Sequence, residues 1–169
     1  MQRALAIMVM AAAMLMPVGV AAQDDADCWT RLVMAPVETT ILPEGFAFAS
    51  LRVDDSWGGT IEDADDGTGN VYFGVGCRTD AELVMARTRD VTEALGLMDK
   101  VGAIIIGDES YATRSADALD LRLEWRHGDL LGYVWSSGFE SEYSDVGYLP
   151  IEIGDLERIA LAIDATLPD

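Results

Sequence analysis

Basic residues are scarce in this sequence of 169 residues, which has 30 Asp and Glu against 11 Lys and Arg and a formal net charge of -19 at pH 7. Lys100 is the only lysine. Binding to nucleic acid or to anionic lipid requires clustered Lys and Arg, so this charge balance excludes nucleic-acid binding. We expect an anionic, solvated surface.

Histidine and cysteine are also rare, with one His and two Cys. The single His127 stands in a predicted tight turn, where a solvated side chain is expected. The sequence has no Gly-x-Ser-x-Gly motif, no phosphate-binding Gly loop and no His-x-x-x-His pair. It therefore predicts a protein that is not an enzyme. A hydrolase that uses paired carboxylates is a third possibility, but composition alone nominates no pair among so many acids.

Long apolar runs are absent apart from residues 4–16. Arg3 precedes this run and small residues up to Ala22 follow it, which is the pattern of a secretory signal peptide. The run is shorter than the ~20 residues that span a bilayer. We expect residues 1–22 to be cleaved before Gln23, which would give a periplasmic or secreted protein without stable membrane insertion. An uncleaved membrane anchor and a lipoprotein are the alternatives.

Export to an oxidising compartment predicts a Cys28–Cys77 disulfide, because two cysteines allow one pairing. Alternation places Cys77 on the apolar face of a strand at residues 71–78. The bridge would tie an N-terminal arm, residues 23–36, to a single domain, residues 37–169. Free thiols and metal-bound thiolates are the alternatives, although two Cys and one distant His are too few ligands for a structural zinc site.

Strand patterns come first along this domain and helical patterns later. A buried strand is predicted at residues 46–53, and further strands are predicted at 57–61, 71–78, 103–106, 119–126 and 131–135. Helices are predicted at 90–101, where Gly102 would end the helix, and at 155–165. Residues 81–89 fit either a strand or a helix, and we assign them to a strand. The clearest feature is the hairpin turned at 127–129, which follows the alternating strand that ends in Trp125 and Arg126. The sequence predicts an α+β fold, a curved antiparallel sheet with one or two helices packed on one face.

The acidic loop at residues 62–70 offers oxygen ligands for calcium. The candidate ligands are Asp63, Asp65, Asp66 and Asn70. The loop does not fit the helix-loop-helix calcium motif, because placing Gly67 at the sixth position puts Ala64 at the third. An ordinary acidic hairpin loop is the other interpretation, and no other cofactor is expected.

Three landmarks occur in order along the chain: Leu42-Pro43-Glu44-Gly45-Phe46 opening a strand, the hairpin at 123–133, and Leu149-Pro150 before the last helix. This order resembles the small C-terminal domain of RseB/MucB-type periplasmic sigma-factor regulators and a related uncharacterised extracytoplasmic domain of anti-sigma factors. The resemblance covers about residues 37–167. It implies contact with an anti-sigma factor or sensing of the envelope state, and no catalytic residues. The acidic insertion at 54–70 and the disulfide depart from the family pattern.

Together these features predict an exported, non-enzymatic protein-interaction or sensor module whose partner is an envelope or secreted protein. A calcium- or small-ligand-binding periplasmic protein is the alternative. Aromatic side chains in loops can anchor interfaces, although each can also serve core or loop packing. The candidate partner contacts are Trp57, Phe139, Tyr143 and Tyr148.

Overall fold

The computed structural model describes residues 27–35, 37, 40–54, 56–64, 71–99, 104–114, 120–137 and 151–168. The strands in this part of the chain are β1 (Phe46–Val53), β2 (Trp57–Asp63), β3 (Val71–Cys77), β4 (Met98–Asp99), β5 (Glu109–Arg114), β6 (Asp120–His127) and β7 (Leu130–Ser137). The helices are α3 (Ala81–Ala94) and α4 (Ile153–Asp164), together with a helical segment at residues 27–34.

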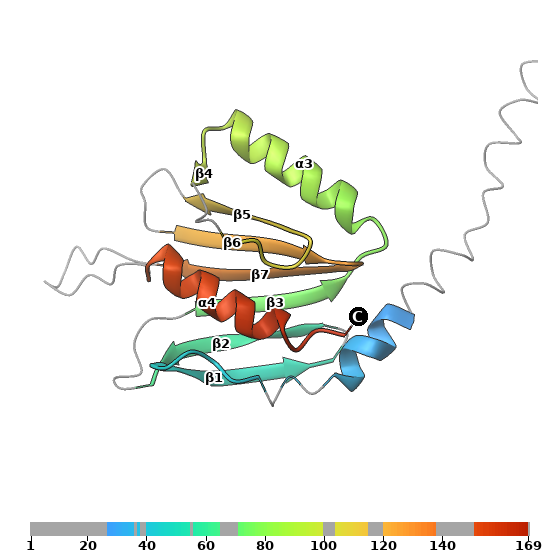
Figure 1. Cartoon of the computed structure of the whole chain (residues 1–169), viewed down its shortest axis with the longest axis vertical. Coiled ribbons are helices and arrows are strands. Elements are labelled where there is room, and N and C mark those ends of the chain that lie inside the picture. Colours follow the sequence, from blue (N-terminus) through green and yellow to red (C-terminus); the bar gives the residue numbers. More distant parts are fainter. Residues whose placement is uncertain are drawn as a thin grey trace, which may run out of the picture.

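The seven strands form one antiparallel sheet in the order β1-β2-β3-β7-β6-β5-β4 (Figure 1). The predicted hairpin is confirmed, with a two-residue turn that pairs His127 with Leu130. Gly128 has a φ of 60°, a left-handed conformation that glycine adopts without strain. The α+β class and the antiparallel sheet are therefore as predicted.

Apolar side chains from two helical elements cover one face of the sheet. Leu156, Ile159 and Ile163 of α4 are buried with Leu123 and other residues of the sheet in one core. Leu32 of the segment 27–34 is buried in the same core. Figure 1 shows α4 lying across the sheet, with the segment 27–34 near the end of α4. The prediction of one or two helices packed on one face is confirmed by α4, and the segment 27–34, which was predicted only as an arm, packs on the same face. Helix α3 lies against Arg122 and Tyr133 of the opposite face.

The assignment of residues 81–89 to a strand was wrong, because they begin α3. Ala81, Met85 and Thr92 are its buried residues, whereas Leu83 is 49% exposed. Burial at positions 81, 85 and 92 follows the helical period of 3.6 residues and not the alternation of a strand. The sequence allowed both patterns, and packing against the sheet selects the helix.

The helix predicted at 90–101 ends early, at Ala94. Gly96 takes a φ of 69°, and the amide N–H groups of Gly96 and Leu97 donate to the carbonyls of Glu93 and Thr92. These two bonds form a Schellman motif, which ends a helix at glycine. The expected end at Gly102 lies outside the described residues.

The strand predicted at 103–106 is absent from the described residues 104–106. Ile106 is buried there, but Ile105 is 73% exposed. Two further expectations need smaller corrections. Residues 46–53 form a half-exposed strand at the edge of the sheet where a buried strand was expected, and the last helix begins at Ile153, ahead of the expected Asp155.

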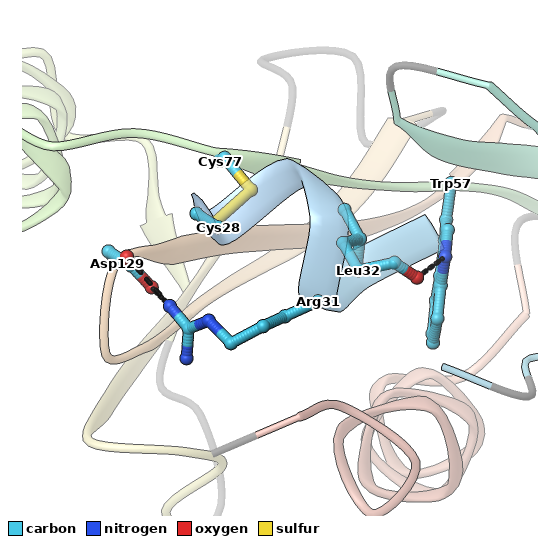
Figure 2. The surroundings of a disulfide bond; sticks show 6 residues. All are labelled: Cys28, Arg31, Leu32, Trp57, Cys77 and Asp129. Carbon is cyan, nitrogen blue, oxygen red and sulfur yellow. Dashed lines mark hydrogen bonds and ion pairs between the residues drawn. A yellow bond between two sulfur atoms is a disulfide. The ribbon is translucent and has the colours of Figure 1, made fainter. Parts of the chain in front are cut away.

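The N-terminal arm is held by three contacts of different kinds (Figure 2). The predicted disulfide joins Cys28 to Cys77, with their Cα atoms 6.0 Å apart. The indole N–H of Trp57 donates to the carbonyl of Leu32 over 2.9 Å, and Arg31 forms an ion pair of 3.1 Å with Asp129. The described part of the arm is thus built into the core.

Removing the disulfide with the double variant Cys28→Ser/Cys77→Ser is expected to lower the free energy of unfolding. The bridge closes a loop across a sequence separation of 49. Loss of this restraint on the unfolded chain costs about 4 kcal/mol in the chain-entropy model. Urea unfolding at equilibrium measures the change.

The matched control is Arg31→Gln, which removes the exposed ion pair of the same segment and is expected to cost less than about 1 kcal/mol. A double serine variant as stable as the wild-type protein would contradict a stabilising role for the bridge.

Candidate functional site

The structure places the sequence-predicted contact Trp57 in the core. Its side chain is 1% exposed and its indole N–H is bonded to the chain at Leu32. Its proposed role as an exposed partner contact was therefore wrong. The other three candidates, Phe139, Tyr143 and Tyr148, lie outside the described residues.

Asp63 ends β2, and the other calcium candidates Asp65, Asp66 and Asn70 lie outside the described residues. In the part of the chain that the structure describes, no group of three or more His, Cys, Asp or Glu side chains is placed to hold a metal ion. The calcium site stays a prediction.

His127 is not a freely solvated turn residue. Its Nδ1 atom lies 3.0 Å from the Oδ1 atom of Asp164, and its side chain is 27% exposed. Because Asp164 ends α4, this contact fastens the helix to the β6–β7 turn.

The sheet face opposite α4 carries two rows of side chains in register. Ser50, Thr60, Tyr72 and Trp135 form one row across β1, β2, β3 and β7. Arg52, Gly58, Gly74 and Tyr133 form the next row. We call the six larger side chains the open face: Ser50, Arg52, Thr60, Tyr72, Tyr133 and Trp135. A groove of about 390 Å³ runs along it and is lined by all of them except Trp135.

The open face is poor in acidic residues in a chain that has 30 of them. Strands β1, β3 and β7 contain no Asp, Glu or Lys, and their only ionisable basic residue is Arg52. The acidic residues of β2 come at its end, at 62–63. The strongly negative charge of the protein is thus carried elsewhere.

Aromatic rings lie along the open face. The rings of Tyr72 and Trp135 pair with their centroids 5.1 Å apart, and Tyr72 is 37% exposed. Tyr133 lies flat over Gly74, where an added Cβ would come within 2.6 Å of the ring. The guanidinium carbon of Arg122 lies 4.6 Å from the centroid of the same ring, within reach of a cation–π interaction.

A second hollow of about 300 Å³ lies between α3 and the sheet, beside the open face. We call it the α3 pocket. It is lined by Val84, Met85, Thr88, Arg122, Glu124, Trp125, Leu131, Gly132 and Tyr133. The α3 helix is held over this pocket by an ion-pair chain, since Glu109 pairs with both Arg89 of α3 and Arg126 of β6 at 3.1 Å.

Arg122 and Glu124 form the polar floor of the α3 pocket, and Tyr111 contacts Glu124 from outside the lining. The Nε atom of Arg122 lies 2.7 Å from the Oε1 atom of Glu124, and the hydroxyl of Tyr111 donates to its Oε2 atom. Burial raises the pKa of the Tyr111 phenol, and the Glu124 carboxylate adds to this effect. The phenol therefore keeps its proton, and both carboxylate oxygens of Glu124 are engaged.

Sequence reasoning missed Tyr72, Tyr133 and Arg122 as site residues. The available signal was the register of the β6–β7 hairpin, because its short turn pairs Trp125 with Gly132 and so points Tyr133 away from the core. No protein-family model, characterised protein or solved structure matched this chain. The site therefore stands on its own geometry.

The packing of Tyr133 on Gly74 predicts the result of a double-mutant cycle. Gly74→Ala is expected to lower the free energy of unfolding by about 1 kcal/mol, because the new methyl group displaces the Tyr133 ring and its stacked Arg122. In a Tyr133→Ala background the same substitution should cost almost nothing, since the clash is gone. Urea unfolding of the four proteins gives the coupling.

Gly58→Ala is the matched control in the same row. A Cβ there meets only the Phe73 carbonyl at 3.6 Å, an ordinary contact, so the change should stay within about 0.5 kcal/mol. If Gly74→Ala lowered the free energy of unfolding equally with and without the Tyr133 ring, the position of the ring would not depend on this glycine.

Proposed function

We propose that this protein is an exported, non-catalytic interaction module that binds a partner protein through the open face. The observation that carries the proposal is the near absence of acidic residues from the strands that form this face, in a chain with a net charge of -19. A random distribution of 30 acids would place several of them there.

The composition of the open face matches that of protein interfaces. Their centres are depleted in Asp, Glu and Lys and enriched in Tyr, Trp and Arg. Tyr72 is 37% exposed, Trp135 and Tyr133 are half-buried, and Arg52 supplies a charged group that is paired with Asp54. Aromatic and arginine side chains are also the most frequent energetic anchors of interfaces.

The negative charge of the remaining surface favours specific binding. A net charge far from zero keeps a protein from associating through unselected surfaces, and like charges oppose wrong partners. A partner that approaches the open face meets no carboxylate in β1, β3 or β7. We therefore infer that charge repulsion opposes the approach of a partner least at the open face.

The disulfide supports export, because such bonds persist in oxidising compartments such as the periplasm. Among the described residues, no helix is long and apolar enough to cross a bilayer. The resemblance to RseB/MucB-type domains favours a partner in the cell envelope, and a regulatory role there belongs to the proposal.

Site-specific crosslinking tests the proposed surface. With p-benzoylphenylalanine in place of Tyr72, irradiation of cells that export the protein is expected to give one adduct of defined mass. The same group in place of Leu83, which is exposed on α3, should give none. Thr60→Asp should reduce the Tyr72-site adduct by roughly tenfold or more, because it buries an unpaired charge in the interface.

Thr79→Asp adds the same charge in an exposed turn and should leave the adduct unchanged. Adducts of equal yield at positions 72 and 83, or an adduct insensitive to Thr60→Asp, would rule out the open face as the binding surface.

Export itself is tested by the N-terminal sequence of the protein recovered from the periplasm or medium. We expect it to begin Gln-Asp-Asp-Ala-Asp, because cleavage after the small residue Ala22 removes the signal peptide. The variant Ala22→Arg should block cleavage at this site, because the signal peptidase requires a small residue there. Recovery of the wild-type protein only in the cytoplasm with its first residues intact would refute the export proposal.

A further inference from the structure

We propose that the α3 pocket binds a small monocarboxylate with a short apolar tail, held through the guanidinium of Arg122. This site adjoins the partner contact proposed for the open face and shares Tyr133 with it. It uses the terminal nitrogens of Arg122 and the underside of α3, neither of which the proposed partner contact requires.

The pocket has the size and lining of a small-molecule site. Its volume of about 300 Å³ lies at the lower end of the range for ligand pockets, which suits a ligand of few atoms. Val84 and Met85 of α3 and Leu131 of β7 form an apolar wall, and Arg122, Glu124 and Tyr133 contribute polar groups. Such a lining binds a molecule that is apolar at one end and polar at the other.

Arg122 is held in place before any ligand arrives. Its Nε atom is fixed by Glu124 at 2.7 Å, and the guanidinium lies 4.6 Å from the centroid of the Tyr133 ring. Among the described residues, Glu124 is its ion-pair partner and Tyr133 its ring contact, and its side chain is 45% exposed, so the guanidinium is accessible to a ligand. A guanidinium held in this way presents a planar pair of donors that matches a carboxylate.

The charges of the pocket select the class of ligand. Both oxygens of Glu124 already accept bonds from Tyr111 and Arg122, which leaves Glu124 little capacity to hold a cation. Arg122 has five N–H donors and its side chain is 45% exposed, so it can accept an anion in addition to its contact with Glu124. Glu124 stands close by and the chain has a net charge of -19, so a single negative charge is better tolerated than a phosphate dianion.

The probes for the test are hexanoate, hexanamide and hexylammonium, which each have six carbons and differ in charge. Each is titrated into the ¹⁵N-labelled exported protein at about 0.15 M salt, where screening limits long-range repulsion. Amide signals of α3, β6 and β7 report binding. Hexanoate should bind with saturation, and the other two probes should bind at least about tenfold more weakly, the loss expected when a charge-assisted bond is missing.

Two variants locate the binding. Arg122→Gln should weaken hexanoate at least about tenfold for the same reason. Val84→Phe fills the pocket from α3 while keeping Arg122, and it should abolish the saturable shifts. Arg87→Gln removes an exposed arginine of the same helix and should change nothing.

Three results would overturn the proposal. Hexanamide binding as tightly as hexanoate would reduce the pocket to an apolar hollow, and tighter binding of hexylammonium would make Glu124 the recognition group. Unchanged hexanoate binding in both Arg122→Gln and Val84→Phe would place the ligand elsewhere. None of these results bears on the crosslink at position 72, so the two proposals fail separately.

Discussion

The pairing register of β7 with its two neighbours is the constraint on which both faces of the molecule depend. Trp125 of β6 lies over Gly132 of β7 on the core side, where an added Cβ would come within 2.3 Å of the indole. On the other side, Tyr133 lies over Gly74 of β3. A slip of one residue would exchange the two faces of β7 and put Tyr133 into the core. The two glycines thus let one large ring lie flat on each side of the same sheet.

The distribution of charge follows from the same sheet. Several arginines sit in exposed ion pairs, as with Arg78 and Asp80, and such pairs contribute little stability. These arginines do neutralise the charge of the acidic residues next to them. Strands β1, β3 and β7 need no such balance because they carry no acid. The open face is thus built mainly from strands without acidic residues in a chain of net charge -19.

Local patterns predicted the elements whose neighbours in space are also neighbours in sequence. The β6–β7 hairpin followed from alternation, and the disulfide followed from the number of cysteines and the inferred compartment. Residues 81–89 were assigned wrongly because their apolar positions fit two periods, and only the exposure of Leu83 against the burial of Met85 decides between them. Trp57 is buried against the segment of Leu32, to whose carbonyl its indole N–H donates. The two residues are 25 positions apart, so no local sequence pattern could predict this contact. The open face requires the register of four strands at once, which explains why the loop aromatics were chosen in its place.

Arg122 and Tyr133 connect the α3 pocket to the open face, since both line the pocket and Tyr133 also lies in the groove. The attraction between the guanidinium and the ring is electrostatic, so a carboxylate bound to Arg122 would weaken it by neutralising the charge that faces the ring. The ring would then be held over Gly74 less firmly. A partner that packs on Tyr133 would bind the two states with different affinity, and the carboxylate would feel the partner by the same factor, because coupling between two binding sites is reciprocal.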